Sequence, residues 1–166
     1  MKGVCVEPNP VLCKLIRSVR SKDKCLNIGV STSSDQNGLD FFVLNPHTLS
    51  TFSKEDTEKL QKNGEAKIEQ VIKIQVQTIN QIIESNFDRV PDLISLDVEG
   101  LNEQIIDTFN FAHRPKVFCL ETLEYSPQEN PRKLTHMISV LEKNNYGLIA
   151  DTYLNSIFVD KSLMLK

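Results

Sequence analysis

The chain has 166 residues, of which 40% are hydrophobic and 25% are charged, and its formal net charge is −3 at pH 7. This size and composition predict one folded domain and exclude a disordered chain, a collagen-like repeat and a coiled coil. The weakly acidic charge argues against a nucleic-acid partner, because phosphate binding requires a basic surface. We also expect no membrane span, since no apolar run approaches ~18 residues, and no signal peptide, since the apolar run at the start is too short and is followed at once by the charged Glu7.

Four cysteines and three histidines are scattered along the chain. The cysteines are Cys5, Cys13, Cys25 and Cys119. No two of them form a Cys-x-x-Cys pair, so their spacing indicates neither a metal site nor a disulfide framework. We therefore expect buried, reduced thiols and a cytoplasmic location.

Short apolar runs alternate with helical periodicity from the start of the chain, a pattern that indicates an α/β fold. The first run, residues 4–6, ends at Glu7. Asn9 and Pro10 then predict the N-cap and the first residue of a helix. Residues 25–30 are predicted to form the second strand.

The middle of the chain continues this alternation. Residues 39–44 predict an extended segment, and Ser53 predicts the start of a polar helix. Residues 68–76 alternate in polarity, as in a half-exposed strand. We expect residues 39–77 to form an insert or cap that shapes an acceptor site, within a single domain spanning residues 1–166.

The most informative run is the near-continuous apolar segment at residues 93–96, which leads into Asp97-Val98-Glu99-Gly100. Such a run is typical of a central parallel strand that helices cover on both faces. A helix is predicted at residues 101–109, and another buried strand at residues 117–120 ends at Glu121.

Two further elements are predicted towards the C-terminus. Asn130 and Pro131 have the residue types of an N-cap and a first helical residue, so they predict the start of another helix. Residues 148–150 and 157–159 predict a closing antiparallel strand pair.

Acidic residues end three of the predicted strands: Glu7, Asp97 and Glu121. In open α/β sheets, ligands bind at the carboxyl ends of the strands, where an acid after the second strand commonly accepts hydrogen bonds from an adenosine ribose. Glu7 fits that function. It equally fits a charge that the dipole at a helix N-terminus favours.

Asp97 and Glu99 are separated by one residue, so an extended chain would point both carboxylates the same way. Such a pair can bind a hard cation, hold a substrate hydroxyl or amine, or act as acid and base. The simpler alternative is that one of them caps the helix that follows Gly100.

The combination of these motifs resembles the FkbM-type methyltransferases. It consists of Glu-Pro-Asn-Pro after the first strand, Leu-Asp-Val-Glu-Gly-Leu-Asn-Glu after a central one, and Leu-Glu-Thr after the next. The similarity runs from Gly3 to about Asp160. It implies a Rossmann-like sheet, S-adenosylmethionine as cofactor, and methylation of a hydroxyl on a sugar, a glycolipid or a natural product.

The resemblance also assigns functions to residues. It implies that Glu7 binds the ribose, and it places Glu7, Asn9 and Asp97 among the cofactor-binding residues. Asp97 and Glu99 are the catalytic candidates near the methyl donor and acceptor, where either can act as base, directly or through Mg²⁺. Glu121 is expected to bind the substrate.

One part of the family pattern has no counterpart in this sequence. The first strand, its glycine-containing loop and the following helix would come before Gly3, so we expect an N-terminally truncated sheet that binds the cofactor weakly or not at all. The exposed strand edges would then favour a homo-oligomer. The alternative function is an inactive methyltransferase-like remnant or interaction subunit, while an NAD-dependent oxidoreductase is disfavoured because no Gly-x-Gly-x-x-Gly occurs.

Overall fold

The computed structural model describes residues 3–98, 100–126 and 129–164. The chain divides into two compact units, Met1–Thr78 and Ile79–Lys166, and each is described by itself. Both units combine helices with strands, which confirms the predicted mixed α/β class.

The first unit begins with a strand–helix–strand motif, β1-α1-β2. The elements of the whole unit are β1 (Val4–Val6), α1 (Pro10–Val19), β2 (Lys24–Leu26), β3 (Gly29–Val30), β4 (Asp35–Asn45), the short 3₁₀ helix η1 (His47–Leu49), α2 (Lys54–Lys62) and β5 (Lys67–Gln77). β1 and β2 pair in parallel, with Cys5 opposite Cys25. As predicted, Asn9 caps α1 and Pro10 stands in its first turn.

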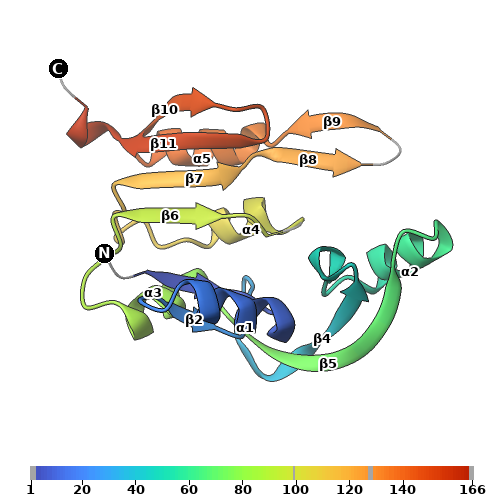
Figure 1. The fold of residues 1–166 in the computed structure, drawn as a ribbon. Coiled ribbons are helices and arrows are strands. Elements are labelled where there is room, and N and C mark those ends of the chain that lie inside the picture. Colours follow the sequence, from blue (N-terminus) through green and yellow to red (C-terminus); the bar gives the residue numbers. More distant parts are fainter. Residues whose placement is uncertain (1–2, 99, 127–128, 165–166) are drawn as a thin grey trace. The chain divides into compact units, whose positions relative to one another are not determined.

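The rest of the first unit is a second sheet, with strand order β3-β5-β4. β4 and β5 form the long curved antiparallel pair in Figure 1. Their inner faces contribute Phe41, Val43 and Ile74 to a core against which Phe52 packs, with the Phe41 and Phe52 ring centroids 4.8 Å apart. The predicted insert, residues 39–77, corresponds to most of this sheet and to α2.

The prediction of one strand at residues 25–30 was wrong. β2 ends at Leu26, and β3 belongs to the other sheet. The reason is Asn27, whose side-chain Nδ2 donates to the carbonyl oxygens of Glu7, at 2.9 Å, and of Pro8, at 2.7 Å. These bonds hold the chain at the β1–α1 turn and separate β2 from β3.

The second unit contains a four-stranded sheet of order β10-β11-β7-β6 (Figure 1). Its elements are α3 (Ile79–Asn86), β6 (Leu93–Leu96), α4 (Asn102–Asp107), β7 (Val117–Glu121), β8 (Leu123–Ser126), β9 (Glu129–Lys133), α5 (Thr135–Lys143), β10 (Tyr146–Asp151), β11 (Asn155–Asp160) and the 3₁₀ helix η2 (Lys161–Leu163). β6 and β7 run parallel, whereas β11 pairs antiparallel with both β7 and β10. The predicted C-terminal antiparallel pair is therefore confirmed.

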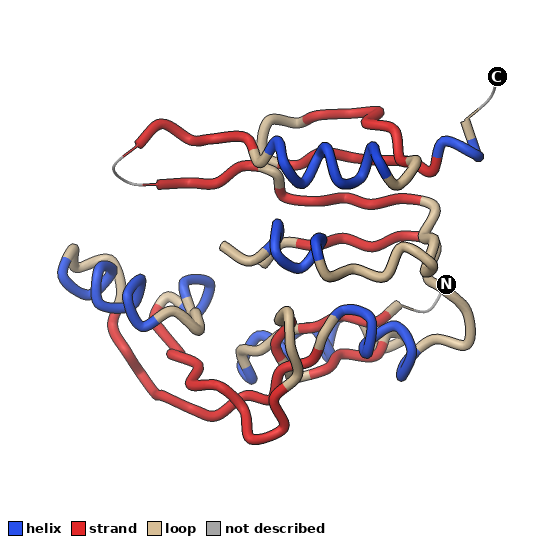
Figure 2. Tube along the Cα trace, turned by 180° about the vertical axis from the view of Figure 1, so that it is seen from behind, coloured by secondary structure: helices blue, strands red, loops and turns tan. Residues whose placement is uncertain are grey.

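The core of the second unit lies between this sheet and the helices α4 and α5, which cover the same face (Figure 2). Phe118, Tyr146 and Phe158 are fully buried there. Phe118 and Tyr146 meet edge to face with ring centroids 5.0 Å apart, and the Tyr146 hydroxyl donates to the Pro115 carbonyl at 2.8 Å.

The prediction that a helix begins at Asn130 and Pro131 was also wrong. Residues 129–133 form β9, which pairs antiparallel with β8, and α5 begins only at Thr135. The Leu134 N–H donates to the Thr122 carbonyl at 2.8 Å, so the chain stays tied to the β7–β8 junction until the helix begins. This long-range pairing outweighs the local Asn-Pro signal.

β6 lies at one edge of the four-stranded sheet, and its side chains alternate between exposed and buried. Leu93 is 55% exposed, whereas Ile94 and Leu96 are buried. The expectation that both faces of this strand are covered was therefore wrong for Leu93 and Ser95. Pairing between chains through such an edge stays a prediction.

Candidate functional site

Glu7 follows β1 and is held on both its backbone and its side chain. Its N–H donates to the Leu26 carbonyl at 3.0 Å, and its Oε1 accepts from the N–H of Asn9 at 2.7 Å. The side chain is half-buried, and burial raises the pKa of Glu7, while the hydrogen bond from Asn9 opposes that rise. Glu7 is therefore a carboxylate with a defined direction and a reduced preference for charge.

Asn9 is only 1% exposed, and its side chain is used within the unit. Its Oδ1 accepts from the N–H of Val11 at 2.9 Å and of Leu12 at 3.4 Å, which is the N-cap interaction of α1. Its Nδ2 donates to Ser50 Oγ at 3.0 Å and to the His47 carbonyl at 3.3 Å. Because Asn9 caps the helix, the carboxylate of Glu7 is not needed for that purpose.

Asp97 follows β6, and its side chain is exposed. The helix α4 starts at Asn102, its N-cap residue Leu101 makes no side-chain capping bond, and the described residues show no hydrogen bond between the Asp97 carboxylate and the helix. Asp97 thus does not cap this helix. Glu99, the other half of the predicted pair, lies outside the described residues, and Gly100 has a φ of +71°, a conformation that glycine adopts without strain.

Asn102 ties the ends of β6 and β7 together. Its Oδ1 accepts from the Val98 N–H at 2.8 Å, and its Nδ2 lies 3.4 Å from Glu121 Oε2 and 3.5 Å from the Glu121 carbonyl. Leu96 pairs with Leu120, so Asp97 and Glu121 occupy the next positions of neighbouring parallel strands. The predicted acids Asp97 and Glu121 therefore stand at the same end of one sheet.

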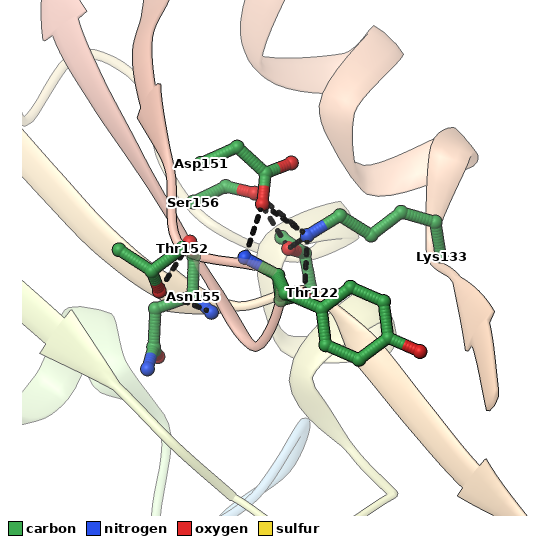
Figure 3. Close-up of polar contacts among 7 residues, drawn as sticks. Thr122, Lys133, Asp151, Thr152, Asn155 and Ser156 are labelled. Atoms are coloured by element: carbon green, nitrogen blue, oxygen red, sulfur yellow. Dashed lines mark hydrogen bonds and ion pairs between the residues drawn. The ribbon is translucent and has the colours of Figure 1, made fainter.

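A lysine that sequence reasoning did not single out organises the region after Glu121 (Figure 3). Lys133 Nζ donates to Asp151 Oδ1 at 2.8 Å, to the Tyr153 carbonyl at 2.7 Å and to Thr122 Oγ1 at 2.9 Å. Thr122 and Ser156 are fully buried, and their hydroxyl oxygens lie 2.6 Å apart. The hydrogen bond from Lys133 is the main cause that lowers the pKa of Asp151.

A hollow of about 410 Å³ opens beside this cluster, between β9 and the first turns of α4 and α5. Its walls are formed by Glu103, Arg132, Lys133, Leu134, Thr135 and His136. His136 Nε2 lies 2.9 Å from Asp107 Oδ1, so two acidic and three basic side chains surround or adjoin the hollow. This polar wall suits a ligand with several hydrogen-bonding groups.

The predicted site residues divide between the two units. Glu7 and Asn9 belong to the first unit, and Asp97 and Glu121 to the second. Within the described ranges, no group of three or more His, Cys, Asp or Glu side chains is arranged to hold a metal ion. Asn27, Asn102 and Lys133 were missed because each acts through contacts with residues distant in the sequence.

This mixed α/β chain has acidic residues at the ends of β1, β6 and β7, the position where open α/β sheets generally bind their ligands. The chain belongs to the FkbM methyltransferase family, because the model of the Methyltransferase FkbM domain matches residues 1–148. Searches of curated proteins and of solved structures returned no match. Among the helices of the described residues, none has the length and hydropathy needed to cross a bilayer.

Proposed function

We propose that this chain is an S-adenosylmethionine-dependent methyltransferase that methylates a hydroxyl oxygen of a sugar, a glycolipid or a natural product. Membership of the FkbM family supports methyl transfer. The observation that carries the mechanism is the exposed Asp97 at a strand end, whose carboxylate does not cap the following helix.

Glu7 fits the ribose of this cofactor. The Asn9 N–H bonds Oε1 of Glu7, and Oε2 has no hydrogen-bond partner among the described residues. That second oxygen can accept a ribose hydroxyl, and desolvation strengthens hydrogen bonds to the ionised form. Asn9 contributes by orienting Glu7 through its backbone. Bound S-adenosylmethionine supplies an electrophilic methyl group on a sulfonium.

Asp97 is the proposed general base. An acceptor hydroxyl becomes a good nucleophile only as its proton leaves, and a carboxylate at hydrogen-bond distance accepts that proton. Alignment of the acceptor oxygen with the methyl group provides the rest of the rate enhancement. Glu99 is the proposed second acid of this pair.

The acceptor is proposed to contact Glu121 and the hollow beside Lys133. The hollow adjoins Glu103, the neighbour of Asn102, and Asn102 in turn contacts Glu121. Its mixture of donors and acceptors matches a polyhydroxylated group better than an apolar one.

The test is methyl transfer to a panel of glycans and hydroxylated natural products, measured as formation of S-adenosylhomocysteine. Asp97→Asn should lower turnover by about 10²–10⁴-fold, the usual contribution of a general base. Asp92→Asn is the matched control, because Asp92 precedes the same strand and pairs with Lys116 at 2.8 Å on the surface. It should leave turnover unchanged.

Equal turnover in Asp97→Asn and the unchanged chain would contradict the assignment of the base. Repeating the assay with Mg²⁺ and with a chelator distinguishes direct proton transfer to Asp97 from chemistry through a metal. Absence of turnover with every acceptor, together with absence of cofactor binding, would favour the inactive alternative.

A further inference from the structure

Two buried thiols are in contact in the first unit. Cys13 on α1 and Cys25 on β2 are 1% and 6% exposed, and both are free. Their Sγ atoms lie 3.2 Å apart and share a hydrogen bond in which either thiol can donate. The proposed methyl transfer uses neither of them.

We propose that Cys13 and Cys25 are a modification site, which a small-molecule disulfide of the glutathione class converts to an intramolecular disulfide. The sulfurs must approach by roughly 1.2 Å, from 3.2 Å to the ~2.05 Å of an S–S bond. α1 and β2 pack against each other, so the two elements that would have to move are already neighbours in the reduced protein.

The reaction is a pair of thiol–disulfide exchanges. The thiolate of one cysteine attacks the small disulfide, forms a mixed disulfide and releases one small thiolate. The second cysteine thiolate attacks the protein sulfur of that mixed disulfide and releases the other. Two protein thiols are oxidised, one small disulfide is reduced to two thiols, and the two cysteine protons pass to the released thiolates.

The surroundings make this oxidation slow and selective. Burial raises the pKa of Cys25 to about 12, with the neighbouring Cys13 adding to the rise, so little thiolate forms at neutral pH. Cys5 stands opposite Cys25 in the strand register and is the competing partner. The direct Sγ contact, however, is between Cys25 and Cys13.

The disulfide would join the two elements that support Glu7. The Leu26 carbonyl of β2 accepts from the Glu7 N–H, and Asn9, the N-cap residue of α1, donates its N–H to the Glu7 carboxylate. Closing the loop between residues 13 and 25 restricts the unfolded chain, and the oxidised protein should melt several degrees higher than the reduced one.

The experiment treats the full chain with oxidised glutathione, alkylates the remaining thiols after denaturation, and maps tryptic peptides by mass spectrometry. A link is expected between the peptide of residues 3–14 and that of residues 25–54. Because residues 3–14 contain both Cys5 and Cys13, the Cys5→Ser variant is treated in parallel. The expected result is loss of two thiols in both proteins, with the same link and with Cys119 still alkylated.

Three results would overturn the proposal. The first is that all four thiols of the folded chain are alkylated under conditions that cross-link the urea-unfolded chain. The others are a link that disappears in Cys5→Ser, and a glutathione adduct that persists without forming the Cys13–Cys25 disulfide. The readout does not involve methyl transfer, so it is independent of the proposed function.

Discussion

Glu7 combines a proposed binding function with an energetic cost. Its burial is partial, but burial disfavours the charged carboxylate and so raises the pKa of Glu7. The same environment that strengthens a hydrogen bond to a ribose hydroxyl therefore destabilises the folded chain when no ligand is bound.

This conflict predicts the behaviour of Glu7→Gln. A carboxyl whose folded pKa is raised is favourable below its unfolded pKa and becomes unfavourable as the pH rises through the folded value. Because Gln keeps the acceptor for the Asn9 N–H but carries no charge, Glu7→Gln should melt on the order of 1–3 °C higher at neutral pH. Thermal melts at several pH values test this.

The gain should vanish as the pH falls below 4.5, the ordinary pKa of the side chain, because Glu7 is then protonated in both states. Glu58→Gln on α2 is the control, since its carboxylate is 66% exposed. A gain of equal size at every pH would show that burial of the charge is not its cause.

At the residue scale, the predictable features were those whose signal is local. Strand-end acids such as Glu7, Asp97 and Glu121 stand next to apolar runs, and Asn9 precedes a proline, so the sequence alone indicates them. Asn102 and Lys133 carry no such signal. Asn102 acts on Glu121, 19 positions away, and Lys133 on Asp151, 18 positions away.

Among the elements, β9 differs most from the expectation based on sequence, because it is a strand paired with β8 and not the start of a helix. Local residue types at Asn130 and Pro131 favour a helix start, but pairing with β8 and the Lys133 cluster favour a strand. Lys133 connects the end of β9 to the turn between β10 and β11 through Asp151 and the Tyr153 carbonyl (Figure 3). The cluster therefore also fixes one wall of the proposed acceptor hollow.

Lys133→Met should consequently destabilise the protein by about 1–3 kcal/mol, because the buried hydroxyls and the Tyr153 carbonyl lose a charged donor. Chemical denaturation measures the free energy of unfolding. Lys116→Met is the matched control, since Lys116 forms an exposed pair with Asp92 and should cost less than about 1 kcal/mol. Similar losses in both variants would contradict a structural function specific to Lys133.

At the scale of the whole molecule, one family match covers residues of both units. The FkbM match spans residues 1–148, so it includes the whole first unit and the proposed base and acceptor residues of the second. The α/β class was predictable because the alternation of apolar runs is a property of the whole chain. The division of the strands among separate sheets was not, because pairing between distant strands decides it.

The central claim is that this chain binds the methyl donor through Glu7. The most direct measurement is an NMR titration of the ¹⁵N-labelled chain with S-adenosylhomocysteine, which detects even weak binding and locates it. We expect saturable shifts at the amides of Glu7 and Asn9, with affinity at least tenfold lower in Glu7→Gln and unchanged in Glu58→Gln. Saturable binding that leaves these two amides unshifted, equal affinity in Glu7→Gln, or no shifts at millimolar ligand would contradict it.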